Sequence, residues 1–295
     1  MNDTFESGSV GGKPPGPDVS LIIAVYNQPK FLRWIFLSLL NQTFGNFETV
    51  ISDDGSDEAI GRVIDEFQPR FRRPIRHIRQ ENRGFRKTVI ANRAVGSAGA
   101  DYLIFTDGDC ILHHRFIERH YVRRRRGTVL SGRRVSFDDL LAQRLTDEDI
   151  TTRRIERFSF WRGHCSGSEA RHGFYFPPLF RLDGLFRRKW PILGCNFSLY
   201  KSDFLAVNGY DERIIGRGME DSNLYERMRV KKMRFRNLSR EAIQYHIFHK
   251  TDPVPHSAET IRQFTQPADY WTEFGVVKKK RQSDKVKEYN KSRKN

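Results

Sequence analysis

Two kinds of segment alternate between residues 19 and 105. Residues 19–25, 48–52, 75–78 and 102–105 are short runs with the composition of buried strands. Residues 31–40 and 86–95 have the composition of helices, and Ile60, Val63, Ile64 and Phe67 form one apolar helical face between them. Strands that alternate with helices predict an α/β fold, a mostly parallel sheet covered by helices.

Composition narrows the class of protein. Hydrophobic residues make up 38% of the chain, which is enough for a sizeable core. The longest unbroken apolar run, residues 21–26, is too short to span a bilayer. Residues 1–17 are rich in Gly, Pro and Ser and have no apolar stretch, so we expect a flexible leader and not a signal peptide. The three cysteines match no disulfide framework or zinc motif, which favours a cytoplasmic protein with reduced thiols.

Acidic residues follow two of the predicted strands. Asp53 and Asp54 end one strand, and Asp107 and Asp109 end another. In an open α/β sheet ligands bind at the carboxyl ends of the strands, where a divalent cation would offset the repulsion between carboxylates. Both motifs also have the chemistry of ordinary turns, which is the alternative interpretation of each motif alone.

Two further pairs carry chemistry. Glu220 and Asp221 open a predicted helix after a Gly-rich turn, where acidic residues are also common helix caps. His246 and His249 are spaced as two metal ligands can be, although packed surface histidines would give the same spacing.

Together these motifs resemble the family 2 glycosyltransferases. The opening half matches in SLIIAVYN (20–27), SLLNQT (38–43), VISDDGS (50–56), GFRK (84–87) and YLIFTDGDCI (102–111). GCNFS (194–198), VNGYDE (207–212), GMED (218–221) and YHIFH (245–249) are similar to the acceptor-side half of galactosyl- and N-acetylgalactosaminyltransferases. The resemblance implies the Rossmann-like GT-A fold and an inverting transfer of sugar from a nucleotide sugar.

The resemblance also implies how the chain is divided. A domain over 18–250 would contain a nucleotide-sugar-binding half (18–125), an insertion or lid (136–190) and an acceptor or catalytic half (191–250). A basic extension, 251–295, would follow it.

Site residues follow from the matched motifs. The nucleotide-contacting Asp falls on Asp53, and the Asp-x-Asp motif on Asp107 and Asp109, with Asp109 as the direct metal ligand. The general base falls on Asp221, beside Glu220. The metal-completing histidine falls best on His249, with His246 as a neighbour or second ligand.

The residues suggest the same chemistry. A diphosphate leaving group develops negative charge, which a divalent cation and the basic Arg86 and Lys87 would stabilise. A carboxylate can take the proton of the acceptor hydroxyl. Imidazole beside carboxylate favours Mn²⁺ over Mg²⁺. Arg217 stands where related galactosyltransferases often carry Trp, which leaves the acceptor open. His113 and His114, which follow the Asp-x-Asp loop, are expected to be surface residues.

The resemblance points to a UDP-linked hexose or N-acetylhexosamine as donor. The acceptor would be a glycan or glycolipid hydroxyl in surface polysaccharide or lipopolysaccharide biosynthesis. A metal-dependent nucleotidyltransferase is one alternative. A nucleic-acid-binding protein is another, because the net charge is +16, but no nucleic-acid-binding motif is present.

Basic residues also suggest where the enzyme works. The tail 278–295 is strongly basic, and residues 178–190 mix aromatic and basic side chains. Both features suit peripheral contact with an anionic membrane, such as the inner face of the plasma membrane. A lid over residues 178–190 and a solvated tail are the alternative.

Overall fold

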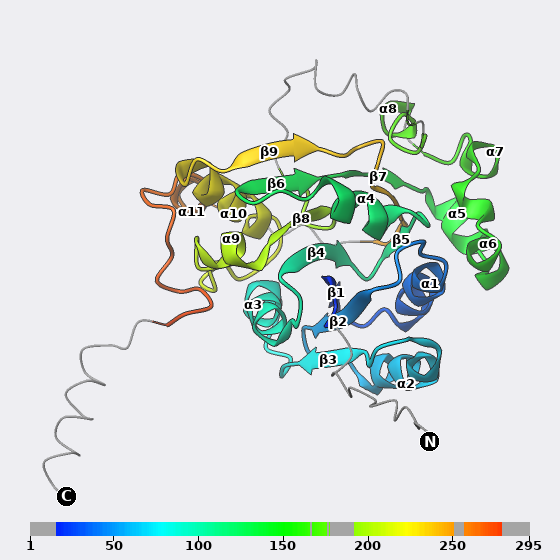
Figure 1. Cartoon of the computed structure of the whole chain (residues 1–295), viewed down its shortest axis with the longest axis horizontal. Helices are drawn as coiled ribbons and strands as arrows, with labels where there is room; N and C mark the ends of the chain where they lie inside the picture. Colours follow the sequence, from blue (N-terminus) through cyan, green and yellow to red (C-terminus); the bar gives the residue numbers. More distant parts are fainter. Residues whose placement is uncertain (1–15, 166, 176, 178–191, 251–256, 279–295) are drawn as a thin grey trace, which may run out of the picture.

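The computed structural model describes residues 16–165, 167–175, 177, 192–250 and 257–278 (Figure 1). Its centre is a seven-stranded sheet with the order β3-β2-β1-β4-β8-β6-β9. The strands are β1 (Val19–Val25), β2 (Phe47–Asp53), β3 (Arg76–Arg79), β4 (Tyr102–Asp107), β6 (Thr128–Ser131), β8 (Phe197–Tyr200) and β9 (Arg234–Asn237). The four strands predicted from the apolar runs are therefore confirmed as β1 to β4, within a few residues.

Strand direction in the sheet is mixed. Strand β1 pairs in parallel with β2 and β4, and β2 pairs in parallel with β3, as the alternation predicted. Strand β8 runs antiparallel to both β4 and β6, whereas β9 is parallel to β6. Every strand except β8 therefore has its carboxyl end at the same edge, which we call the catalytic edge.

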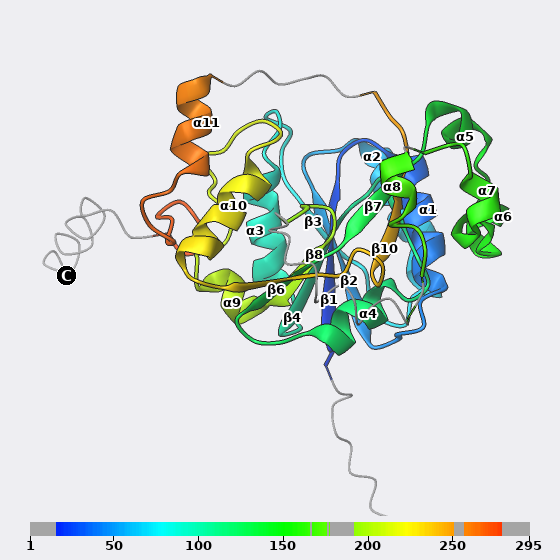
Figure 2. The same cartoon turned by 90° about the horizontal axis from the view of Figure 1, so that it is seen from above.

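Helices cover both faces of the sheet, as Figure 2 shows. One face packs against α1 (Pro29–Leu40), α2 (Glu58–Phe67) and α4 (Phe116–Arg123), and the other against α3 (Lys87–Ser97), α9 (Lys201–Leu205) and α10 (Glu220–Val230). Side chains alternate across a strand, so in β1 Leu21 and Ile23 join the first core and Ile22 the second. The predicted α/β fold with helices on both faces is confirmed.

A second, three-stranded sheet has the order β5-β10-β7. Its strands are β5 (Cys110–Leu112), β7 (Arg133–Ser136) and β10 (Ile243–His246). Strand β10 pairs antiparallel with β5, so that His246 lies opposite Cys110. This pairing joins segments more than a hundred residues apart, which the local sequence pattern did not predict.

The described part of the predicted insertion (136–190) belongs to the folded domain. It forms α5 (Asp139–Arg144), α6 (Asp147–Thr151), η2 (Arg154–Glu156), α7 (Phe158–Trp161) and α8 (Gly167–Ala170). Helix α6 packs against α1, where the Trp34 indole nitrogen donates to Asp147 at 2.9 Å. Trp161 is fully buried in the same core. The lid and membrane interpretations concern residues 178–190, which lie outside the described residues.

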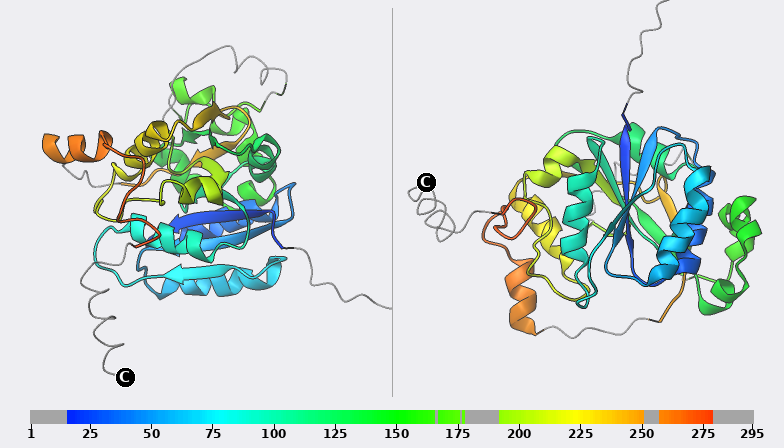
Figure 3. Two further views of the ribbon diagram at one scale, coloured as in Figure 1. Left: turned by 60° about the vertical axis from the view of Figure 1, so that its left-hand side comes forward. Right: turned by 90° about the horizontal axis from the view of Figure 1, so that it is seen from below.

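Helical structure continues beyond residue 250, where the sequence predicted a basic extension. Helix α11 (Ala258–Thr265) packs beside α10, as Figure 3 shows, and its Phe264 carbonyl accepts a hydrogen bond from Asn223. Asn208 also bonds to the backbone of Thr272 and Val277. The folded domain therefore extends to Lys278. The sequence did not predict this extension, because contacts made across the fold leave no local pattern in a basic segment.

Candidate active site

The sheet register brings the two acidic motifs to one place. Asp53 lies opposite Val25 of β1 on one side, and Asp107 lies opposite Ala24 on the other. Only the width of β1 separates these carboxyl ends. Gly108 continues the turn, donating to the Ala24 carbonyl at 2.8 Å. The prediction that both motifs share one edge of the sheet is confirmed.

The Asp53–Ser56 loop is held by its own carboxylates. Asp53 is fully buried; its Oδ1 accepts from the Ser56 amide at 2.8 Å, and its Oδ2 lies 2.8 Å from His77 Nε2. Burial raises the pKa of Asp53, but the hydrogen bonds from His77 and Ser56 outweigh burial and lower the pKa below its ordinary value. Asp54 accepts from the Arg86 amide at 2.7 Å, tying the loop to the start of α3. Direct contact between Asp53 and a nucleotide stays a prediction.

Asp109 and both predicted histidines form one cluster. His249 Nε2 lies 2.8 Å and His246 Nε2 3.4 Å from Asp109 Oδ2, and one ligand atom from each of the three residues lies within 4.8 Å of the others. Burial raises the pKa of Asp109, but the two histidines outweigh burial and hold this pKa well below its usual range. The hydrogen bond to Asp109 raises the pKa of His249. One carboxylate and two imidazoles in this arrangement fit a divalent metal ion.

Asp107 contacts Lys87, and its binding of metal or nucleotide sugar stays a prediction. Its Oδ1 accepts from the partly buried Lys87 ammonium at 2.7 Å, and it is not a member of the Asp109 cluster. Burial lowers the pKa of Lys87, but the neighbouring Asp107, Asp221 and Glu220 carboxylates raise it well above its ordinary value. Lys87 is therefore a permanent cation close to Asp107 and the Glu220–Asp221 pair.

Asp221 has an unpaired oxygen at this site. Its Oδ1 is buried and has no hydrogen-bond partner among the described residues. Burial raises the pKa of Asp221 to about 7. The positive charge of Lys87 lowers this pKa, and the negative charges of Glu220 and Asp107 raise it. A carboxylate with that pKa and a free oxygen can accept a proton near neutral pH.

Glu220 is bound to its own turn. Its side chain is buried, and Oε2 accepts from the Gly218 amide at 2.8 Å. Of the predicted catalytic pair, Asp221 therefore has the oxygen available for chemistry, while Glu220 fixes the turn before α10 and raises the pKa of its neighbour.

The expectation that His113 and His114 are surface residues is wrong. His113 is 5% exposed, and its Nδ1 accepts from the Arg115 amide at 3.2 Å. Glu156 accepts from both the amide and Nδ1 of His114, at 2.7 and 2.6 Å. Burial lowers the pKa of His113 to about 3, so this ring stays neutral. The helices of the 136–190 segment supply Glu156, which explains why the local sequence gave no signal.

Sequence reasoning missed Gly194. An added Cβ at this position would lie 1.9 Å from Asp221 Oδ2, so the backbone of the 193–196 turn contacts the carboxylate directly. The GCNFS motif marked the segment as part of the resemblance, but only the packed fold shows which side chain its glycine faces.

Two models of known protein families match the chain. The family model "Glycosyl transferase family 2" matches residues 20–204, and "N-terminal domain of galactosyltransferase" matches residues 185–250. The chain belongs to glycosyl transferase family 2. Both parts of the resemblance seen in the sequence are confirmed.

Individual relatives match over shorter stretches. Glycosyltransferase GlyG of Streptococcus pneumoniae is 29% identical over 123 residues, which cover 41% of this chain and 40% of the relative. The hyaluronan synthase of Pasteurella multocida is 31% identical over 103 residues, 34% of this chain and 10% of that protein. The chain thus spans less than half the length of these curated relatives.

A solved structure confirms the fold. S. aureus TarS superposes with a TM-score of 0.53 at 14% identity, over 78% of this chain and 37% of that one.

Within the described residues, no helix is both long and apolar enough to cross a bilayer.

Proposed function

We propose that this glycosyltransferase moves a hexose or N-acetylhexosamine from a UDP sugar, with inversion, to a hydroxyl of a glycan or lipid-linked acceptor. The observation that carries the proposal is the unpaired oxygen of Asp221, whose pKa the neighbouring charges of Lys87 and Asp107 influence. Likeness to a hyaluronan synthase supports a role in surface polysaccharide synthesis.

The residues divide the work. Asp221 accepts the proton of the attacking hydroxyl, and one base with direct displacement needs no covalent intermediate. Asp109, His246 and His249 would hold Mn²⁺ in preference to Mg²⁺, because two imidazoles suit Mn²⁺ better. When bound, the ion would stabilise negative charge on the diphosphate leaving group. Arg86, fixed at the start of α3 by Asp54, and Lys87 add positive charge on the donor side.

A donor screen tests this proposal. Purified protein with Mn²⁺ is incubated with a panel of nucleotide sugars, and release of nucleoside diphosphate is measured, with the anomeric configuration of the product read by NMR. We expect UDP release and an inverted product. Release of pyrophosphate would instead indicate nucleotidyl transfer, and a retained configuration would exclude the single-base mechanism.

Peripheral membrane contact is a separate proposal. Basic residues of the tail, 278–295, would each contribute about 1 kcal/mol at an anionic lipid surface. The full chain should cosediment with anionic vesicles at low salt, and removal of residues 279–295 should weaken this. Equal sedimentation with neutral vesicles would contradict an electrostatic contact.

A further inference from the structure

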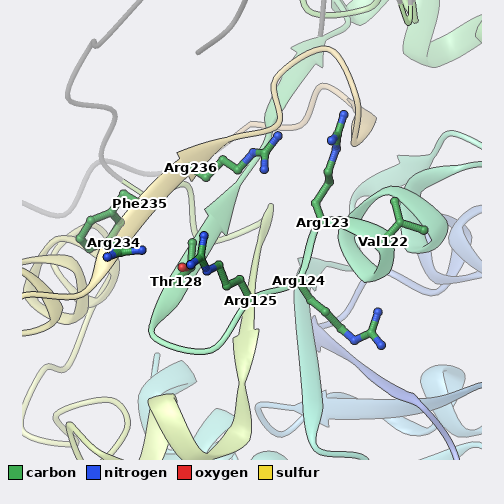
Figure 4. A pocket seen from close by; sticks show the side chains of 8 residues that line it. All are labelled: Val122, Arg123, Arg124, Arg125, Thr128, Arg234, Phe235 and Arg236. Carbon is green, nitrogen blue, oxygen red and sulfur yellow. The ribbon is translucent and has the colours of Figure 1, made fainter. Parts of the chain in front are cut away.

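A second charged site lies on the edge of the sheet opposite the catalytic edge. A pocket of about 410 Å³ opens between the end of α4 and the first residues of β6 and β9 (Figure 4). Strands β6 and β9 run in the same direction as β4, so Thr128 and Arg234, their first residues, lie away from Asp107. The pocket is lined by Val122, Arg123, Arg124, Arg125, Thr128, Arg234, Phe235 and Arg236.

Positive charge gathers in this pocket without a matching negative charge. Five of its eight lining residues are arginines, and none is acidic. Arg123 pairs with Glu241 at 2.7 Å, and Arg124 stacks on the Tyr121 ring. In the part of the chain that the structure describes, the side chains of Arg125, Arg234 and Arg236 have no hydrogen-bond or ion-pair partner.

The end of helix α4 does not account for this arrangement. Basic residues at a helix carboxyl end complement the helix dipole, which would explain Arg123 and Arg124. Arg234 and Arg236 come from β9, more than a hundred residues later, and share one face of that strand. Like charges brought together from two segments repel each other, and a bound anion would offset that repulsion.

Thr128 supplies an independent sign of a ligand. Its side chain is 6% exposed, and its Oγ1 is buried with no hydrogen-bond partner among the described residues. It lies opposite Arg234 in the β6–β9 register, and Figure 4 shows its hydroxyl beside the side chains of Arg125 and Arg234. A buried hydroxyl without a partner is costly, whereas one that donates to a bound anion is satisfied.

We propose that this pocket binds a phosphate group, at a site separate from the one that binds the sugar donor. Guanidinium groups bind phosphate oxygens through paired N–H donors, and the Thr128 hydroxyl adds a second kind of donor. The phosphate could belong to a lipid headgroup or to a soluble phosphate compound, since both present the same oxygens.

Calorimetric titration with inorganic pyrophosphate tests the site in the full chain. EDTA suppresses metal-dependent binding at the catalytic edge. The double variant Arg234→Ala/Arg236→Ala removes two exposed charges from the pocket, and Arg62→Ala/Arg93→Ala removes two exposed charges from α2 and α3 as the matched control. We expect pyrophosphate affinity to fall about tenfold or more in the first and to stay at the wild-type value in the control.

Thr128→Val provides a second measurement, because valine fits a strand and lacks the hydroxyl. We expect a severalfold loss of pyrophosphate affinity with an unchanged melting temperature, and donor hydrolysis at the wild-type rate in all variants. Absence of pyrophosphate binding to the wild type, or equal affinity in the pocket and control variants, would overturn the proposal.

Vesicles identify the source of the phosphate. Wild-type protein is sedimented with phosphatidylglycerol–phosphatidylcholine vesicles and with phosphatidylcholine alone. A lipid headgroup is supported if Arg234→Ala/Arg236→Ala loses sedimentation that Arg62→Ala/Arg93→Ala keeps, and if pyrophosphate competes. A soluble phosphate is supported if these two variants sediment equally while their pyrophosphate affinities still differ.

Discussion

The carboxylate of Asp221 lies against the backbone of Gly194, with no room for a side chain between them. A Cβ at residue 194 would come within 1.9 Å of Oδ2 and 2.2 Å of Oδ1. The nearby Gly194 backbone works against the rise in the pKa of Asp221. One glycine, on a turn before β8, therefore sets the position of the proposed base at the start of α10.

Gly194→Ala should displace the base. The added methyl forces Asp221 to rotate, so we expect transfer to fall by about 10²-fold, the size of effect that a misplacement of roughly 1 Å can have. The free energy of unfolding should fall by about 1–3 kcal/mol. Gly61→Ala is the control, because a Cβ at this position of α2 meets nothing within 4 Å. Wild-type transfer in Gly194→Ala would show that Asp221 is not the base.

Asp221→Asn keeps the shape of the side chain but cannot accept a proton. We expect transfer to fall by roughly 10²–10⁴, with donor affinity nearly unchanged. The measurements are initial rates with donor and acceptor, and nucleotide affinity by calorimetry. Asp65→Asn, on the exposed face of α2, should behave as wild type. An unchanged rate in Asp221→Asn would show that this carboxylate acts only as a helix cap.

The rate should depend on pH through Asp221. Its pKa of about 7 means that the base becomes protonated as pH falls, so kcat/KM should drop about tenfold per pH unit below 7. Lys87 lowers the pKa of Asp221, so Lys87→Met should move this limb of the pH profile to higher pH. A limb that stays in place in Lys87→Met would assign it to another group.

The metal cluster predicts a metal-dependent affinity. Asp109→Ala and His249→Ala should each remove a ligand and abolish the Mn²⁺-dependent part of nucleotide affinity, while circular dichroism shows an intact fold. His164→Ala is the matched control, since this histidine pairs with Asp138, outside the cluster. Mn²⁺ should restore more affinity than Mg²⁺ to metal-stripped wild type. Unchanged Mn²⁺ dependence in Asp109→Ala would remove the metal assignment.

Local pattern was enough to predict much of the first half of the fold. The apolar runs that became β1 and β4 are hydrophobic on both faces, as in any strand covered by two layers of helices, and the helices between them repeat their apolar residues every three or four positions. The rule that parallel strands end at one edge then placed Asp53 beside Asp107 without any coordinates.

The structure of the second half of the chain depends on contacts between distant segments. The order and direction of β8, β6 and β9 depend on pairing between segments far apart in sequence, for which no local signal exists. The burial of His113 depends on helices that the aromatic and basic composition of 136–190 did not indicate. The end of the domain depends on amide contacts made by Asn208, not on periodicity.

The same division holds within the site. The residue types, their place after strands and before a helix, and the family motifs are properties of the chain, and they predicted roles for Asp107, Asp109, Asp221, His246 and His249. Which of them meet is a property of the packed structure. The β5–β10 register places His246 beside Asp109 and leaves Asp107 to Lys87, and a turn before β8 brings Gly194 onto Asp221. These contacts join separate segments, which burial of the whole core brings together, and no short stretch of sequence carries that information.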